Sequence, residues 1–293
     1  MTATILSGKE LAKAMLDEIS AAVADLRAKH DTVPAIAVVR AGEDPASVTY
    51  VKAIEKAFGA RGMGFVLHTL PDTSTQAQLV ALVARLNADK TIHGIMVQEP
   101  MPKGMDEAAV KEALSPDKDV DGVHPVNAGR LTQVSPVGRP PMVGPFFVPA
   151  TPAGGLEILK RNHVQLQGKH AVVVGRSNIV GKPMALLLLR ENATVTICHS
   201  QTADLAEVCR SGDILCAAVG RAKMIKGDWI KPGAVVIDFG VNFVDGQMFG
   251  DVEFEAASQV AGMITPVPGG TGPMTNVMLM RNVLEAARRQ VSV

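Results

Sequence analysis

The stretch HAVVVGRSNIVGKPMALLLL, residues 170–189, decides the fold. It combines an apolar strand, a turn from Gly175 to Gly181 and the start of a helix, which is the order found in half of a Rossmann domain. Gly175 ends the strand, and Gly181 lets the following helix pack closely against the sheet. Backbone N–H groups at the start of that helix can hold a pyrophosphate. The spacing G-x-x-x-x-x-G differs from G-x-G-x-x-G, so a plain turn between strand and helix is the alternative.

The same alternation of strand and helix extends outward in both directions. Strands are predicted at 35–39, 65–68, 94–97, 170–174, 194–198, 214–218 and 235–239, and helices at 7–29, 50–60, 75–87 and 273–289. This rhythm is typical of parallel sheets covered on both faces. The fold class is therefore α/β with two lobes, an N-terminal α/β substrate domain and a Rossmann-like domain with a parallel sheet. We expect the last helix to pack back on the first lobe.

A segment rich in proline and glycine, residues 135–152, marks the junction between the lobes. We therefore predict a substrate-binding catalytic domain of residues 1–147 and 272–293, and a dinucleotide-binding domain of residues 148–271.

Composition excludes several classes of function. Lysine plus arginine equals aspartate plus glutamate at 29 each, so no net charge attracts nucleic acid or an anionic membrane. The longest apolar runs are much shorter than a membrane span. The three cysteines, Cys198, Cys209 and Cys216, lack a C-x-x-C spacing, which indicates buried thiols in a reducing cytoplasm. No metal site is predicted, and we expect a cytoplasmic protein.

Polar residues after two predicted strands indicate which dinucleotide binds. Arg176 and Ser177 follow one strand, and His199 and Ser200 follow the next. An acidic residue at the second position would favour NAD, but none is present. Arginine with two hydroxyl groups suits a 2′-phosphate, so the sequence predicts NADP. The alternative is that Arg176 is an ordinary surface charge.

Several blocks of sequence also resemble one family. Residues 44–57, DPASVTYVKAIEKA, fit the pattern P-A-S-x-x-Y-V-x-x-K-x-K, and VQEPMP, VDG, GRSNIVGKP, DWIKPGAVVIDFGVN and ITPVPGGTGPMT follow in order. The chain resembles the bifunctional methylenetetrahydrofolate dehydrogenase/methenyltetrahydrofolate cyclohydrolase family along essentially its whole length. Four positions depart from the pattern: Ile54 replaces the catalytic lysine, Glu99 a common leucine, Ala150 a cysteine and Thr271 a valine.

The resemblance implies the site residues. Tetrahydrofolate derivatives would be bound by Ser47, Tyr50, Gln98, Asp121, Pro266, Gly269 and Gly270. NADP would be bound by Thr151, Gly175, Arg176, Ser177, Ile179, Val180, Gly181, His199, Ser200, Gly240, Val241 and Thr275. Gln98, Tyr50 and Asp121 would carry the catalytic roles, with Asp121 on the pterin, Tyr50 stacked on its rings and Gln98 beside position 54. Pro266, Gly269 and Gly270 could equally form a structural turn. Asp117 and Asp119 are expected in a solvated loop.

Ile54 separates the family's two reactions. Hydride transfer needs mainly geometry, because the folate nitrogens stabilise the resulting cation. Hydrolysis of the methenyl cation requires protons to be moved, and isoleucine has no group that can do this. Lys52 and Lys56 lie two residues away on either side, about 200° around a helix, so neither shares the face of Ile54. The sequence therefore predicts a retained dehydrogenase and a lost or strongly reduced cyclohydrolase.

Two alternatives remain open. One is a fully bifunctional enzyme with a relocated proton shuttle, such as Gln98 and an ordered water. The other is a non-catalytic regulator that binds folate or NADP. The resemblance also implies a homodimer through the NADP domain, and residues 244–254, VDGQMFGDVEF, could form the contact through a hairpin with a D-G turn.

Overall fold

The computed structural model describes residues 2–139 and 143–291. The chain forms two compact units. One takes in the described residues of Met1–Lys13, Arg130–Gly144 and Pro149–Thr275, and the other those of Ala14–Gly129, Pro145–Val148 and Asn276–Val293. We call them the six-stranded unit and the three-stranded unit after their main sheets.

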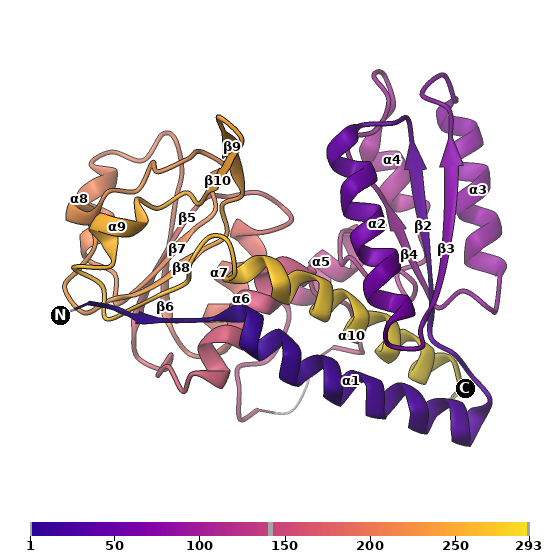
Figure 1. The fold of residues 1–293 in the computed structure, drawn as a ribbon, viewed down its shortest axis with the longest axis horizontal. Helices are drawn as coiled ribbons and strands as arrows, with labels where there is room; N and C mark the ends of the chain where they lie inside the picture. The colour runs from indigo at the N-terminus through magenta and orange to yellow at the C-terminus, as the bar shows by residue number, and fades with distance from the viewer. Residues whose placement is uncertain (1, 140–142, 292–293) are drawn as a thin grey trace. The chain divides into compact units, whose positions relative to one another are not determined.

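The six-stranded unit is built on a parallel sheet. Its strands, in spatial order, are β1 (Thr4–Ile5), β11 (Met263–Ile264), β8 (Val235–Asp238), β7 (Ile214–Ala217), β5 (His170–Val174) and β6 (Thr194–Cys198). Its helical segments include α6 (Ala150–Arg161), α7 (Gly181–Arg190), α8 (Leu205–Arg210), η1 (Gly227–Trp229) and α9 (Phe254–Ala257) (Figure 1). Val172, Leu215 and Val236 have no exposed surface, as expected for central strands covered on both faces. The three cysteines are free and buried, as predicted.

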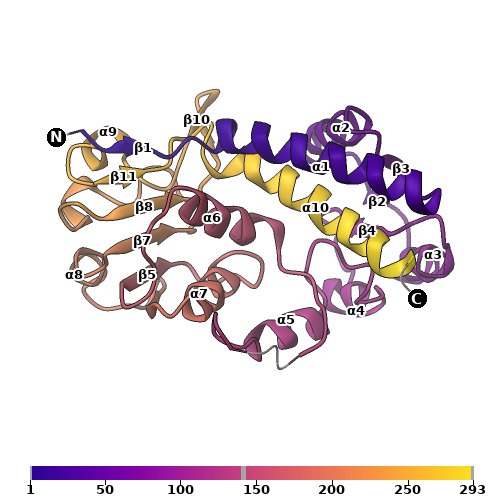
Figure 2. The same ribbon diagram turned by 90° about the horizontal axis from the view of Figure 1, so that it is seen from below.

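The three-stranded unit contains a second parallel sheet. Its strands are β3 (Gly64–Leu70), β2 (Ala35–Ala41) and β4 (Gly94–Val97), with β2 in the centre. Helices α2 (Pro45–Gly59) and α3 (Gln76–Ala88) lie on opposite faces of this sheet (Figures 1 and 2). The α3 face is a core that includes Ala37, Val39 and Ile95. α4 (Glu107–Glu112) and the start of α5 (Pro125–Thr132) follow.

The last helix confirms the prediction that the chain returns to the first lobe. α10 spans Thr271–Val291, and its residues from Asn276 onward belong to the three-stranded unit. Asn282 Nδ2 donates to the carbonyls of Val120 and Val148 at 2.8 and 3.1 Å. α10 runs beside α1 (Gly8–His30) in both views (Figures 1 and 2).

The D-G turn predicted in residues 244–254 is confirmed as a hairpin. Strands β9 (Asn242–Val244) and β10 (Gln247–Phe249) pair in antiparallel fashion. Asp245 and Gly246 between them have φ angles of 51° and 75°. Two positive φ values are what a tight two-residue hairpin turn needs. Phe243 on this hairpin is 69% exposed.

The first strand is absent from the predicted elements. β1 has only two residues, too few to show a pattern, but it pairs with β11 near the other end of the chain. This pairing places residues up to Lys13 in the six-stranded unit, whereas the predicted domain bounds assign them to the first lobe. Among the described residues, no helix is both long and apolar enough to cross a membrane.

Candidate active site

The N-terminus of α2 is tied to the segment that follows β4. Asp44 Oδ2 accepts a hydrogen bond from Ser47 N at 2.9 Å and so caps the helix. The Ser47 hydroxyl donates to the Glu99 carbonyl at 2.9 Å. Two predicted parts of the folate site, Ser47 and the Gln98–Glu99 segment, therefore lie against each other.

The buried stripe of α2 explains the environment of Ile54. Ser47, Val51, Ile54 and Phe58 recur at helical spacing and are at most 5% exposed, and Ile54 has no exposed surface. Lys52 and Lys56 are exposed, which agrees with the prediction that neither shares the face of Ile54. Tyr50 is half-buried one turn before Ile54. Position 54 thus supplies apolar packing and no titrating group.

Gln98 lies directly beyond β4. Its N–H donates to the Val39 carbonyl at 2.8 Å, which continues the pairing of β2 with β4. Its side-chain Nε2 donates weakly to the Glu99 carbonyl at 3.4 Å. Its Oε1 is buried without a hydrogen-bond partner among the described residues. An unpaired buried acceptor is costly, so Gln98 retains capacity for one more interaction.

Asp121 has the clearest electrostatic perturbation in the three-stranded unit. Burial raises its pKa to about 7; the negative charges of Asp119 and Glu99 add to this effect and the ammonium group of Lys111 opposes it. Burial also raises the pKa of the Tyr50 phenol above its usual range, and the negative charge of Asp121 raises it further. Asp121 is therefore within electrostatic reach of both Tyr50 and Glu99.

The neighbouring aspartates differ from each other. The prediction that Asp119 lies in a solvated loop is wrong, because Asp119 has no exposed surface. Its carboxylate accepts hydrogen bonds from His124 N, Val123 N and Asn127 Nδ2 at 2.8 to 3.1 Å. Asp119 therefore shapes the loop that presents Asp121, while Asp117 is exposed as predicted.

An ion pair that sequence reasoning missed lies beside this loop. Lys111 Nζ on α4 is 2.5 Å from Glu99 Oε1 and 3.7 Å from Glu107 Oε2. The spacing of Glu107 and Lys111 on a helix was visible in the sequence, but the partner of Glu99 was not. Within this pair, the Glu99 carboxylate raises the pKa of Asp121 and the Lys111 ammonium group lowers it.

We expect Glu99→Gln to lower the pKa of Asp121 and Lys111→Met to raise it. If Asp121 binds the folate as predicted, only its charged form can accept two N–H groups, so kcat/KM for the folate should fall as the pH decreases through about 7 in the unmodified chain. The midpoint should move down in Glu99→Gln and up in Lys111→Met. Glu107→Gln is the matched control, because Glu107 also contacts Lys111 but does not act on Asp121. Identical pH profiles of kcat/KM in all four proteins would contradict this.

The turn after β5 requires glycine at both predicted positions. Gly175 has a φ of 128°, and a Cβ atom there would lie 2.1 Å from the Ala218 carbonyl oxygen. A Cβ atom at Gly181 would lie 2.2 Å from the Gly175 carbonyl oxygen. The Ser177 hydroxyl accepts hydrogen bonds from Val180 N and Gly181 N at 3.1 and 3.3 Å, which fixes the start of α7. The turn would therefore present backbone N–H groups, and not side chains, to an approaching pyrophosphate.

The residues predicted to select NADP follow adjacent strands. β5 and β6 pair in parallel, with Val174 opposite Cys198, so Arg176 and Ser200 follow neighbouring strand ends. Both are exposed, and His199 N donates to Thr202 Oγ1 at 2.9 Å. Ile179 is 43% exposed and Val180 partly buried. An arginine and hydroxyl groups at this edge, without a carboxylate, fit the 2′-phosphate of NADP.

Two buried carboxylates, also missed from the sequence, hold the loops after β7 and β8. Asp238 accepts from the backbone N–H groups of Gly240, Asp251 and Val252 at 2.8 to 3.0 Å. Asp251 accepts from Val219 N, Gly220 N and Arg221 N at 2.6 to 2.9 Å. Burial raises the pKa of Asp238 to about 6. They fix the backbone of Gly240 and so the position of the exposed Val241, two predicted cofactor residues.

The remaining predicted residues also belong to the six-stranded unit. The hydroxyl groups of Thr151 and Thr275 lie 3.3 Å apart. Pro266, Gly269 and Gly270 form a turn before α10, in which Lys9 N donates to the Gly269 carbonyl at 3.1 Å. Tyr50, Gln98 and Asp121 belong to the three-stranded unit, so the predicted folate residues are divided between the two units.

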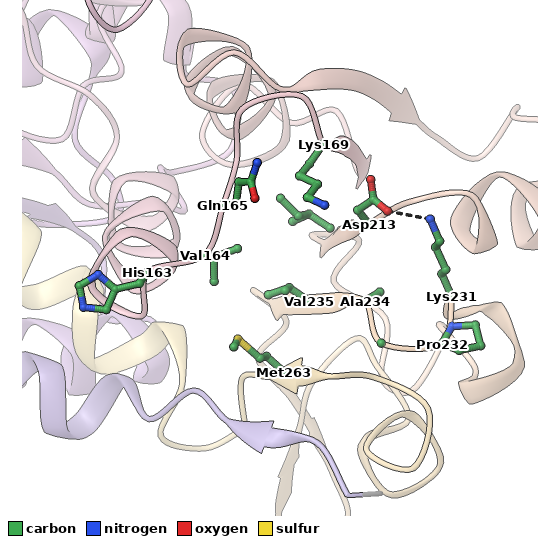
Figure 3. A pocket seen from close by; sticks show the side chains of 12 residues that line it. His163, Val164, Gln165, Lys169, Asp213, Lys231, Pro232, Ala234, Val235 and Met263 are labelled. Atoms are coloured by element: carbon green, nitrogen blue, oxygen red, sulfur yellow. Dashed lines mark hydrogen bonds and ion pairs between the residues drawn. The ribbon is translucent and has the colours of Figure 1, made fainter.

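A separate cavity lies at the opposite edge of the six-stranded sheet. It measures about 340 Å³ and is lined by Lys169, Asp213, Lys231 and Met263 among others (Figure 3). Lys231 Nζ is 2.7 Å from Asp213 Oδ1, and this contact lowers the pKa of Asp213. The cavity adjoins the first residues of β7 and β8, whereas parallel sheets bind ligands beyond the last residues of their strands. No predicted site residue lines it.

The parallel six-stranded sheet, its glycine turn and the helix α7 that follows define a dinucleotide-binding domain, accompanied by a second α/β domain with a polar cluster. Residues 149–291 match the NAD(P)-binding domain of tetrahydrofolate dehydrogenase/cyclohydrolase, and residues 6–121 match its catalytic domain. The chain belongs to the tetrahydrofolate dehydrogenase/cyclohydrolase family.

Individual relatives agree along the whole chain. A bifunctional protein FolD of Chloroflexus aggregans is 51% identical over 294 residues and covers 100% of both chains. The crystal structure of a bifunctional FolD from Campylobacter jejuni superposes with a TM-score of 0.93 at 39% identity, covering 98% of this chain and 99% of the other. A FolD of Trypanosoma brucei, solved with NADP and an inhibitor, gives a TM-score of 0.92 at 38% identity and covers 100% of both chains. The predicted family and fold class are confirmed.

Proposed function

We propose that this protein oxidises 5,10-methylenetetrahydrofolate with NADP and also hydrolyses 5,10-methenyltetrahydrofolate, without a lysine at position 54. The electrostatic coupling of Asp121 with Tyr50 and Glu99, in a chain of this family, carries the proposal. Relatives about half identical to this chain are named bifunctional, which favours retained hydrolysis over the loss predicted from Ile54. The regulator hypothesis is disfavoured, because the polar cluster and the glycine turn are both present.

Binding and orientation are the tasks of this chain's residues in the first reaction. The Asp121 carboxylate accepts two N–H groups from the pterin edge, and Tyr50 stacks on the ring system. The Gly175–Gly181 turn and Arg176 would hold NADP, which would supply the acceptor for the hydride. No protein group has to gain or lose a proton, so Ile54 does not impair this step.

The second reaction adds water to the methenyl carbon and releases one proton. Gln98 can orient the attacking water, and the proton passes to bulk water instead of a lysine. General acid–base groups contribute about 10²–10⁴-fold, so we expect hydrolysis to be slower than in relatives with the lysine. A dehydrogenase that leaves hydrolysis to other enzymes is the second candidate, favoured by the complete burial of Ile54.

Assays of both reactions with the purified chain test this function. We expect NADP reduction with methylenetetrahydrofolate and decay of methenyltetrahydrofolate above the uncatalysed rate. Ile54→Lys should raise the decay rate by about 10-fold or more, because it restores a proton-transferring group. Ile54→Met keeps the packing without that group and should change neither rate more than about two-fold, as expected for volume-conserving substitutions.

The outcomes separate the candidates. If methenyltetrahydrofolate decays at the uncatalysed rate in the presence of the unmodified chain, only the dehydrogenase candidate remains. Absence of NADP reduction as well would contradict both enzymatic candidates and leave the regulator hypothesis.

We extend the proposal to a homodimer through the six-stranded unit. Phe243 and Val244 on β9 are 69% and 44% exposed, and Val241 directly before β9 is 55% exposed. Exposed apolar residues gathered on and beside one hairpin are typical of an association surface.

A further inference from the structure

Arg40 and Gln98 occupy neighbouring positions on two paired strands. β2 and β4 are parallel, with Val39 opposite Val97, so the next residues in this register are Arg40 and Gln98. The hydrogen bond from Gln98 N to the Val39 carbonyl at 2.8 Å extends the pairing to this point. Residues opposite each other in parallel strands direct their side chains to the same face. Arg40 and Gln98 are therefore side-chain neighbours.

The face they share is the one covered by α2. Side chains alternate along a strand, and Val39 belongs to the core against α3. Arg40 and Gln98 consequently lie on the opposite face, toward the helix that carries Tyr50 and Ile54 (Figure 1).

Each of the two side chains has one buried polar atom without a partner among the described residues. In Arg40 it is Nε, which can only donate, and in Gln98 it is Oε1, which can only accept. The Arg40 side chain is 11% exposed, and its guanidinium reaches Glu43 only at 4.0 Å, with the Glu43 side chain 90% exposed. Buried unpaired groups are rare in native proteins, and here an unpaired donor adjoins an unpaired acceptor.

We propose that Arg40 is a positioning residue for Gln98, whose Oε1 accepts a hydrogen bond from Arg40 Nε–H in the folded protein. The inference rests on the proposed function, since it assigns Gln98 to the folate site.

The bond would determine which end of the Gln98 amide faces the substrate. Arginine has no acceptor atom, so it holds the amide oxygen and leaves the NH₂ group free to turn toward the folate or the attacking water. Ile54 offers no polar atom to Gln98, which leaves Arg40 as the cationic neighbour in register with it.

A double-mutant cycle on the full chain tests the pair. The proteins are the unmodified chain, Arg40→Met, Gln98→Met and the double variant, with tetrahydrofolate binding measured by calorimetry. Each single variant should weaken binding about 10-fold, and the double variant should bind no more weakly than Gln98→Met, because the two side chains act as one unit. Arg40→Lys keeps a donor on a stem of similar length and should recover most of the affinity.

Two further measurements complete the test. Glu43→Gln removes the other contact of Arg40 and should leave binding unchanged. The equilibrium constant of unfolding, measured for the same four proteins without ligand, should show a coupling of at least about three-fold. This measurement tests the pair even if tetrahydrofolate is not the substrate. Additive effects in both cycles, or equal affinities of Arg40→Lys and Arg40→Met, would overturn the inference. An unmodified chain that binds no tetrahydrofolate but shows the coupling would refute the proposed function alone.

Discussion

Replacing Asp121 with asparagine is expected to lower kcat/KM for methylenetetrahydrofolate by about 100- to 10 000-fold. In the proposed function the carboxylate accepts two N–H groups of the pterin, and each hydrogen bond to a charged group is worth about 1.5–3 kcal/mol. Asparagine keeps one acceptor and turns an NH₂ group toward the other pterin N–H. A buried donor then faces a donor, which is more costly than a missing contact.

Steady-state kinetics at pH 8, where Asp121 is mostly ionised, measures this loss. The affinity for NADP should be unchanged, because Asp121 and the Gly175–Gly181 turn belong to different units. Asp117→Asn is the matched control, since Asp117 is exposed in the same loop and should retain full activity. An active Asp121→Asn enzyme would remove Asp121 from the folate site.

Gly175→Ala is expected to abolish NADP binding, with an affinity loss of at least about 100-fold. The new Cβ atom would lie 2.1 Å from the Ala218 carbonyl oxygen, on the loop directly after β7. Backbone atoms cannot give way as a flexible side chain can, so the turn must move away from the place where the pyrophosphate approaches. We also expect a loss of stability of about 1–3 kcal/mol, as for other overpacked sites.

Calorimetric titration with NADP and thermal unfolding check both parts. Gly168→Ala is the matched control: Gly168 has a positive φ of 75° but no atom within 4 Å of the added Cβ. It should lose a little stability and keep its NADP affinity. Equal NADP affinities of the two variants would show that backbone conformation, and not the close approach, governs the turn.

The sequence predicted the strands better than the contacts around the site. β4, β5 and β6 begin and end at the predicted residues, and β5, a central strand, is a continuous apolar run, as is usual in parallel sheets. β1 was missed, since two residues carry no periodicity and its partner lies more than 250 residues away. Pairing at such a distance depends on tertiary structure, which local patterns do not encode.

The polar residues of the site were also predicted only in part. Ser47, Tyr50 and Asp121 stood out through their motif, whereas the Glu99–Lys111 pair and the unpaired Nε of Arg40 depend on three-dimensional register. Asp119 illustrates the opposite error. A loop rich in aspartate and lysine is usually solvated, but three hydrogen-bond donors compensate the burial of this carboxylate.

The pairing of β1 with β11 also constrains the order in which the chain can acquire its structure. During synthesis β8 remains an unprotected sheet edge until Met263 and Ile264 have emerged, although β1 has been available from the start. The three-stranded unit likewise lacks part of its structure until the residues of α10 from Asn276 onward have been synthesised. Neither unit can therefore be completed before almost the whole polypeptide has been translated, and chains that terminate early would expose an aggregation-prone edge.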